Sequence, residues 1–302
     1  MQSQCLNGFD RMDRIMEHRS KPTVGSIGFS EDRLKDAYGR MDMENHPWAR
    51  HASKEIESLE SLCSTFIGKR IMDAGCGRGR HSLSIAKKYP SSSILGVDYS
   101  EANISSALSK KDGLANVEFE VSDLRDYRPD RTFDIVLCLY DVIGSFPDDS
   151  DNEAIVETLA SCCEVGGYLA VSVMNMELTR HLAHSSNVCD VESDPKVLFD
   201  LPPGDVMHKS GDIFDPDLYL IDTKTGLVYR KEQFGEDSSL PAEYVIRDRR
   251  YTATEITGLV ARHGFDIVDH RYVRAGRWDE PLEPTDPKAK EILVIARKRR
   301  SI

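Results

Sequence analysis

Three glycines at alternate positions follow an acidic residue in the run Asp73-Ala74-Gly75-Cys76-Gly77-Arg78-Gly79. A short apolar strand over residues 70–72 precedes this run, and an amphipathic helix over 81–89 follows it. Glycines at such a turn let the backbone bend sharply and let a ligand lie against bare peptide groups. The free N–H groups at the start of the following helix attract the negative end of the ligand. The segment therefore predicts a nucleotide-binding loop.

The spacing of the glycines narrows the choice of ligand. A dinucleotide fingerprint has the form G-x-G-x-x-G, and its third glycine would fall at Arg80. The pattern present is D-x-G-x-G-x-G. A second apolar strand, residues 94–97, ends in Asp98, which lies 19 residues beyond Gly79. An acid at this distance suits hydrogen bonding to both ribose hydroxyls of an adenosine.

Later apolar segments repeat this arrangement of a strand that ends in polar residues. A third predicted strand, 117–121, ends in Ser122-Asp123-Leu124, and a fourth spans 133–139. A fifth, over 168–173, follows Val165-Gly166-Gly167, which is a helix-stop and turn signal. In this order the strand ends resemble those of the class I S-adenosylmethionine (SAM)-dependent methyltransferases. The resemblance covers residues 66–175 and 250–298.

The resemblance implies SAM as the cofactor and S-adenosylhomocysteine as its product. It places the Asp98 carboxylate on the ribose, the Asp123 carboxylate against the adenine amino group, and the Leu124 N–H beside a ring nitrogen. The other residues that it places around SAM are Asp73, Gly75, Cys76, Gly77, Gly79, Tyr99, Leu139, Tyr38 and Arg50. For Tyr38 and Arg50, as for Trp48, helix packing or surface charge is the alternative role.

Composition limits the classes of protein to which the chain can belong. An apolar content of 40% with 30% charged residues is typical of a soluble protein, and no apolar run approaches the roughly eighteen residues of a membrane span. Residues 1–20 lack the apolar core of a signal peptide, and the seven cysteines include no CxxC pair. We therefore expect a cytoplasmic protein with neither a metal site nor a disulfide framework. The net charge of −12 argues against general affinity for nucleic-acid phosphates, although the tail Arg297–Arg300 is basic.

The order of the predicted elements indicates an α/β fold, a Rossmann-like class I methyltransferase sheet of seven strands whose last strand is antiparallel. The predicted segments are an N-terminal arm and helical cover (1–65, with 1–30 as a mobile arm), a SAM-binding βαβ core (66–175), an inserted β lid (176–250) and a completion of the core sheet (251–302). The predicted helices span 47–63, 81–89, 100–111, 151–163 and 252–263, and the last two strands span 265–274 and 291–297.

The inserted segment carries its own strand signals. A β-hairpin is predicted from two strand segments, Asp217–Ile221 and Leu227–Lys231, with the turn Asp222–Gly226 between them. A third strand is predicted over Ala242–Arg250. Ligands of open α/β sheets bind at the carboxyl ends of the strands, where such an insertion would act as an antiparallel lid. A homodimer contact is the alternative role for this hairpin.

Polar residues follow the fourth strand, where the resembling family places its methyl acceptor. The segment Leu139–Phe146 lacks the Asn/Asp-Pro-Pro-Tyr/Phe tetrapeptide, which argues against adenine, cytosine and glutamine nitrogens as acceptors. Tyr140 and Asp141 are candidates for orienting a substrate or accepting its proton, although Asp141 could instead cap a helical turn. His184, like His181, is either a base with a pKa near neutrality or a surface histidine.

We therefore predict a SAM-dependent methyltransferase that acts on a small molecule by in-line displacement, mainly through positioning. Two alternatives stay open. One is methylation of tRNA or another macromolecule, which would use the basic tail and the arginines Arg247, Arg249, Arg250, Arg274 and Arg277. The other is a SAM-binding regulator without catalysis.

Overall fold

The computed structural model describes residues 25–27, 47–204, 212–233 and 243–299. Most of the predicted arm, together with Tyr38, lies outside these ranges. The chain forms two compact units. The larger unit contains Met43–Gly144, Asp148–Leu178 and Arg250–Ile302, and the smaller contains Met1–Asp42, Ser145–Pro147 and Thr179–Arg249.

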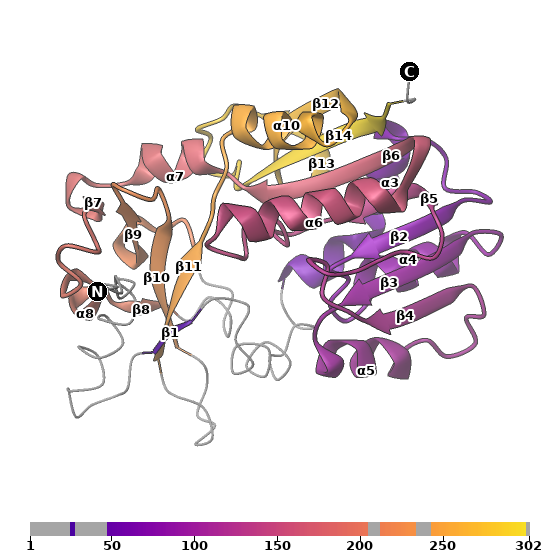
Figure 1. Cartoon of the computed structure of the whole chain (residues 1–302), viewed down its shortest axis with the longest axis horizontal. Coiled ribbons are helices and arrows are strands. Elements are labelled where there is room, and N and C mark those ends of the chain that lie inside the picture. The colour runs from indigo at the N-terminus through magenta and orange to yellow at the C-terminus, as the bar shows by residue number, and fades with distance from the viewer. Residues whose placement is uncertain (1–24, 28–46, 205–211, 234–242, 300–302) are drawn as a thin grey trace, which may run out of the picture. The chain divides into compact units, whose positions relative to one another are not determined.

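The larger unit is built on one sheet, whose eight described strands follow the order β13-β12-β14-β6-β5-β2-β3-β4 (Figure 1). β2 to β6 pair in parallel, whereas β14 is antiparallel to both β6 and β12. The central strands are apolar on both faces, as a parallel sheet covered by helices requires. The bounds are β2 Arg70–Ala74, β3 Ser93–Asp98, β4 Val117–Val121, β5 Phe133–Cys138, β6 Cys163–Met174, β12 Phe265–Arg274, β13 Arg277–Leu282 and β14 Glu291–Lys298.

This sheet differs from the predicted one in two places. The prediction of seven strands is wrong, because β13 pairs antiparallel with β12 at the sheet edge. Edge strands tolerate charge and proline, so the Trp278–Leu282 segment, which contains Pro281, shows little apolar alternation. β6 also starts earlier than predicted, since Gly166 and Gly167 lie within it at an irregularity in the pairing with β5. The prediction that the last strand is antiparallel is confirmed.

Helices pack on both faces of the sheet. α3 and α4 contact each other and share a buried apolar cluster with one face of the strands and with Trp278. α6 and α10 contact each other and cover the other face (Figure 1). Among the described residues, no helix is both long and apolar enough to cross a membrane. The bounds are η1 Pro47–His51, α3 Ala52–Leu62, α4 Arg80–Lys88, α5 Glu101–Ser109, α6 Asp149–Cys162, α7 Met176–Leu182 and α10 Ala253–Arg262.

The smaller unit contains a mixed sheet with the order β1-β11-β10-β9-β7, in which β8 also pairs with β10. The predicted hairpin is confirmed, because β9 and β10 pair antiparallel across a turn where the Asp222 carboxylate accepts hydrogen bonds from the Thr225 N–H (2.7 Å) and hydroxyl (2.6 Å). The predicted third strand is present as β11. The bounds are β1 Gly25–Ile27, β7 Val188–Cys189, β8 Pro203–Gly204, β9 Tyr219–Asp222, β10 Val228–Gln233, β11 Glu243–Asp248, η2 Ser185–Asn187, η3 Pro216–Leu218 and α8 Val197–Asp200.

Candidate functional site

The larger unit contains a cavity of about 350 Å³ at the carboxyl ends of β2 and β5. One side of its wall is the run Asp73–Gly79, which we call the glycine turn, and the other side follows β5. The described residues that line it are Ala49, Asp73, Gly75, Cys76, Gly77, Arg78, Arg80, His81, Leu83, Asn103, Lys110, Leu139, Tyr140 and Val142. Five residues predicted to contact SAM thus line the cavity, namely Asp73, Gly75, Cys76, Gly77 and Leu139.

The glycines of the turn serve different purposes. Gly79 has φ 75°, and a Cβ built there would lie 2.8 Å from the Phe119 ring, so this glycine permits close packing of the turn against β4. Gly77 has φ 53°, but a Cβ built there would meet nothing within 4 Å. Since Gly77 also lines the cavity, its bare backbone faces space that a ligand can occupy.

Two buried acids hold the glycine turn in shape. The Asp73 carboxylate accepts hydrogen bonds from the Ser82 hydroxyl (2.6 Å) and N–H (3.2 Å), which join the end of β2 to the first turn of α4. The Asp98 carboxylate accepts from the N–H groups of Gly77 and Ser100, both at 2.9 Å. Burial raises the pKa of Asp98, and these N–H groups oppose the shift. Asp98 therefore braces the turn from the end of β3.

Six described residues among the predicted SAM contacts do not line this cavity: Gly79, Arg50, Asp98, Tyr99, Asp123 and Leu124. Asp123 binds Arg125, whose Nη2 lies 2.6 Å from its Oδ2. Burial raises the pKa of Tyr99. Asp98 ends β3, Tyr99 follows β3, and Asp123 and Leu124 follow β4. Because β3 and β4 continue the sheet on one side of β2, these four residues lie beyond the cavity along the same sheet edge. Their contacts with SAM stay predictions.

The chain adopts an uncommon conformation directly after β5. Tyr140 and Asp141 have φ of 62° and 64°, a left-handed region that costs free energy for residues other than glycine. The Tyr140 N–H donates to the Ser172 hydroxyl at 2.7 Å, and the Asp141 carboxylate accepts from the Met174 N–H at 3.3 Å. Strained residues held in this way are concentrated at functional sites.

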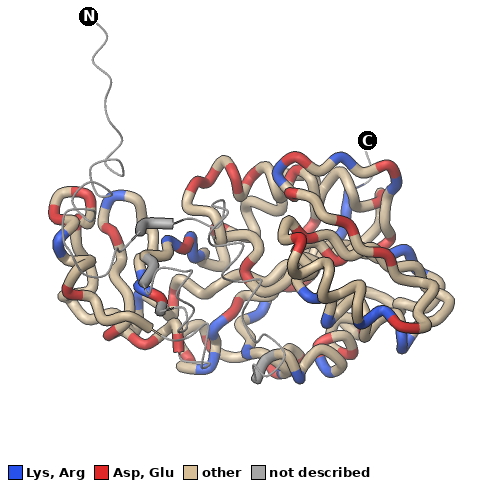
Figure 2. Tube along the Cα trace, turned by 90° about the horizontal axis from the view of Figure 1, so that it is seen from below, with Lys and Arg blue, Asp and Glu red and all other residues tan. Residues whose placement is uncertain are grey.

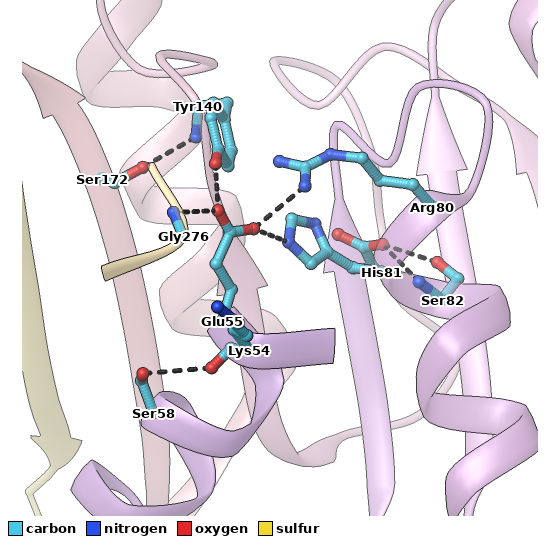
Figure 3. Close-up of polar contacts among 10 residues, drawn as sticks. Lys54, Glu55, Ser58, Arg80, His81, Ser82, Tyr140, Ser172 and Gly276 are labelled. Carbon is cyan, nitrogen blue, oxygen red and sulfur yellow. Dashed lines mark hydrogen bonds and ion pairs between the residues drawn. The ribbon is translucent and has the colours of Figure 1, made fainter. Parts of the chain in front are cut away.

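The Tyr140 hydroxyl donates a hydrogen bond to Glu55 of α3, whose side chain is 0% exposed (Figure 3). The same carboxylate accepts from Arg80 Nη1 (2.9 Å), His81 Nε2 (2.8 Å) and the Gly276 N–H (2.9 Å). We call these five residues the Glu55 cluster. They come from α3, α4, the end of β5 and the β12–β13 turn.

Burial and the contacts within the cluster shift the pKa values of its members in different directions. Burial opposes ionisation of Glu55, but His81, Arg80 and Tyr140 outweigh it and lower the pKa of Glu55 to about 2. Burial and the neighbouring Arg80 lower the pKa of His81, so the ring is neutral and its Nε2–H donates. Burial raises the pKa of Tyr140 well above its usual value. The Arg80 guanidinium lies 4.1 Å from the centroid of the Tyr140 ring.

A second carboxylate lies near the cluster. Glu291 begins β14, and its Oε2 is shielded from solvent without a hydrogen-bond partner among the described residues. Burial and the charge of Glu55 raise the pKa of Glu291 to about 7, against a hydrogen bond from Ser172. Sequence reasoning missed Glu55, Arg80, His81 and Glu291. The available signal was the place of Glu55 on the apolar face of α3, which buries Ala52, Ile56 and Leu59.

The remaining predicted site residues lie elsewhere. Arg50 is exposed beside Ala49, which lines the cavity. His184 and His181 are exposed residues of the smaller unit, and His184 Nε2 lies 3.7 Å from Asp217 Oδ1. The arginines of the alternative prediction are divided between the units: Arg247 and Arg249 in the smaller, and Arg250, Arg274 and Arg277 in the larger.

Comparison with known proteins identifies relatives of the core. A methyltransferase-domain model matches residues 66–218. Malonyl-[acyl-carrier protein] O-methyltransferase 1 of Ilyobacter polytropus is 29% identical over 40% of this chain and 44% of its own length. Trans-aconitate 2-methyltransferase of Variovorax paradoxus is 28% identical over 34% of this chain and 38% of its own length. The chain thus spans less than half the length of these two relatives.

The solved structures agree with the sequence matches. The CcbJ methyltransferase of Streptomyces caelestis superposes with a TM-score of 0.62 over 89% of this chain and 97% of its own, at 12% identity. A SAM-dependent methyltransferase of Clostridium acetobutylicum gives a TM-score of 0.56 over 88% and 98%, at 14% identity. These likenesses confirm the predicted Rossmann-like fold. Together with the family model, which matches half of the chain, they establish that this protein belongs to the methyltransferase-domain family of class I SAM-dependent methyltransferases.

Proposed function

We propose that this protein transfers a methyl group from SAM to a small-molecule acceptor. The observation that carries the proposal is the glycine turn, which leaves Gly77 bare toward a cavity that Tyr140 closes on the side of β5. The residues fit SAM, because backbone N–H groups at the start of α4 suit its anionic carboxylate and the open space at Gly77 admits it closely. Asp98 and Asp123 would then hold the ribose and the adenine along the same sheet edge.

When bound, SAM supplies a methyl group on an activated sulfonium, so the chain needs to bind, orient and exclude water rather than provide a nucleophile. Tyr140 suits orientation, because its hydroxyl already donates to Glu55 and its raised pKa keeps the proton on the oxygen. The Asp141 carboxylate accepts a hydrogen bond from the Met174 N–H and is a candidate to accept a proton from the methyl acceptor. His184 is the candidate base of the smaller unit.

A small acceptor fits the charges of the chain better than a nucleic acid does. Lys and Arg positions are interspersed with Asp and Glu positions along the described chain, and the net charge is −12 (Figure 2). Arg274 and Arg277 both pair with Glu280, which reduces the positive charge that they could offer to phosphates. Of the two relatives, one is named for trans-aconitate, a small molecule, and the other for malonyl-[acyl-carrier protein].

Substitution of single glycines tests the cofactor site. Gly77→Ala would place a methyl group in the space proposed for SAM, so we expect at least a tenfold rise in the Kd of SAM measured by calorimetry. Gly113→Ala is the matched control, because Gly113 also has a positive φ (72°) and also has open space at Cβ. Both variants carry similar backbone strain, of about 1–2 kcal/mol. An equal loss of affinity in both would contradict the proposed site.

Transfer of a labelled methyl group tests the acceptor class. Wild-type protein with labelled SAM should label low-molecular-weight extract and leave purified tRNA unlabelled. Labelling of tRNA that falls steeply as salt rises would favour the macromolecular alternative. Tight SAM binding with no S-adenosylhomocysteine formed from either pool would favour the regulator.

A further inference from the structure

Glu55 carries a buried negative charge for which the proposed transfer has no direct use. Its carboxylate is held ionised by the other members of the Glu55 cluster, and it lies directly behind the cavity wall that Arg80, His81 and Tyr140 form. A buried charge is costly unless it is compensated, so the pairing of Glu55 with Arg80 is the central contact of the cluster. The arrangement of the side chains is visible in Figure 3.

The described residues that line the cavity include three cationic side chains and one acidic side chain. Arg78, Arg80 and Lys110 line it, whereas Asp73 is the acid among its described lining residues. His81 adds no charge, because burial lowers its pKa. Arg80 Nη1 contacts Glu55 at 2.9 Å, so the negative charge of Glu55 directly offsets that of Arg80.

The ligand of this wall is itself a cation at the reacting atom. SAM carries a positive sulfonium, whereas S-adenosylhomocysteine has a neutral thioether in the same place. A guanidinium at the wall without a counter-charge would therefore disfavour SAM much more than S-adenosylhomocysteine, since the interior screens charges weakly.

We propose that Glu55 is a positioning residue that neutralises Arg80 at the cavity wall, so that the site accepts a sulfonium cation, and that fixes the Tyr140 ring against Arg80. The inference rests on the proposed function, because it takes SAM as the ligand. It assigns Glu55 a charge role beyond holding α3 in place. A purely structural anchor would affect both ligands alike.

The ratio of the affinity for SAM to the affinity for S-adenosylhomocysteine tests this charge role. For Glu55→Gln we expect calorimetry to show the Kd of SAM rising about tenfold more than the Kd of S-adenosylhomocysteine. Glu57→Gln is the matched control, because Glu57 belongs to the same helix and its side chain is 66% exposed. The control should leave the ratio unchanged. An equal loss of both affinities in Glu55→Gln would overturn the charge role and leave only an anchor.

Removal of the paired cation provides the opposite test. In Glu55→Gln/Arg80→Met the ratio should return to the wild-type value, even where both affinities stay lower. Arg80→Met alone leaves Glu55 in excess and should shift the ratio toward SAM by a few-fold, which keeps the inference testable if Glu55→Gln fails to fold by circular dichroism. The inference is overturned if Arg80→Met leaves the ratio of the two affinities unchanged or shifts it in favour of S-adenosylhomocysteine.

Failure of the inference can be distinguished from failure of the proposed function. If wild-type protein binds neither ligand, the proposed function is wrong and the inference falls with it. If wild-type protein binds both ligands and forms S-adenosylhomocysteine, but Glu55→Gln keeps the wild-type ratio, only the inference is wrong.

Discussion

The two sides of the cavity are built in different ways. The glycine turn is one continuous run of residues, and its braces come from the next helix and the next strand. The Glu55 cluster, in contrast, joins polar groups from four elements. Its contact of greatest sequence separation connects the Glu55 carboxylate with the N–H of Gly276, 221 residues further along the chain. The first side is specified by local spacing, whereas the second exists only once the sheet and α3 have assembled.

This difference has consequences for stability. Local turns lose little when one hydrogen bond is removed, because neighbouring residues constrain the same backbone. A buried carboxylate with several donors is different, since removal of its charge leaves several groups without an acceptor. We therefore expect substitutions in the Glu55 cluster to lower the stability of the fold more than substitutions in the glycine turn do. Substitutions in the glycine turn should have the larger effect on ligand affinity.

The largest effect is expected for Glu55→Gln. At pH 7 it should lower the free energy of unfolding by about 3 kcal/mol, because the amide cannot accept all the hydrogen bonds of the carboxylate. The pKa of Glu55 is lowered from 4.5 to about 2, so its contribution is present above pH 4.5 and is lost as the pH falls toward 2. Urea denaturation between pH 3 and 7 measures this. A deficit that stays constant with pH would show that the charge of Glu55 is not what stabilises the fold.

Asp98→Ala should have the next largest effect, on ligand affinity. The ribose would lose its proposed acceptor and the turn would lose its brace, so we expect the Kd of SAM to rise by about 100-fold, or about 3 kcal/mol. The Kd of S-adenosylhomocysteine should rise equally, since the ribose is common to both ligands. Asp130→Ala, at an exposed position, is the control. Unchanged affinity would remove the ribose assignment.

The parts of the fold that the sequence predicted well depend on neighbours in the chain. The prediction for β4, residues 117–121, has the observed bounds. The helix predicted over 252–263 is α10, where Thr252 and Glu255 form a reciprocal capping box. Each of these signals lies within a few residues, so it can be recognised without knowledge of the tertiary structure.

The parts that the sequence did not predict depend on distant partners. Nothing local in α4 indicates that Arg80 and His81 face a carboxylate of α3. β13 was missed because its pairing with β12 supplies its stability, while most of its own residues are exposed and half of them are charged. The same reason explains Glu291, whose pKa shift arises from the burial and charge around it.

Glu291→Gln sharpens the comparison at the Glu55 cluster and its neighbour Glu291, because the pKa values of these two carboxylates are shifted in opposite directions. The pKa of Glu291 is raised from 4.5 to about 7, so the folded state loses stability as the pH rises from 4.5 through 7. The variant should therefore be more stable than wild type by about 2 kcal/mol at pH 8, with the gain disappearing near pH 4.5. Thermal unfolding at both pH values provides the measurement. A variant that is less stable at pH 8 would mean that ionised Glu291 has a partner.

Tyr140→Phe should have the smallest effect, and it tests whether the Glu55 side takes part in proton transfer. The ring and its contact with Arg80 are kept, while one hydrogen bond to the ionised Glu55 is lost, at a cost of about 1.5 kcal/mol. Since the hydroxyl proton is bound to Glu55 and the pKa of Tyr140 is raised, kcat should fall only a few-fold and its pH profile should keep its shape. A fall in kcat of more than about 1,000-fold, in the range typical of a lost general base, would make Tyr140 the proton acceptor. In that case the Glu55 side would supply chemistry as well as shape, and the division between a binding side and a positioning side would no longer hold.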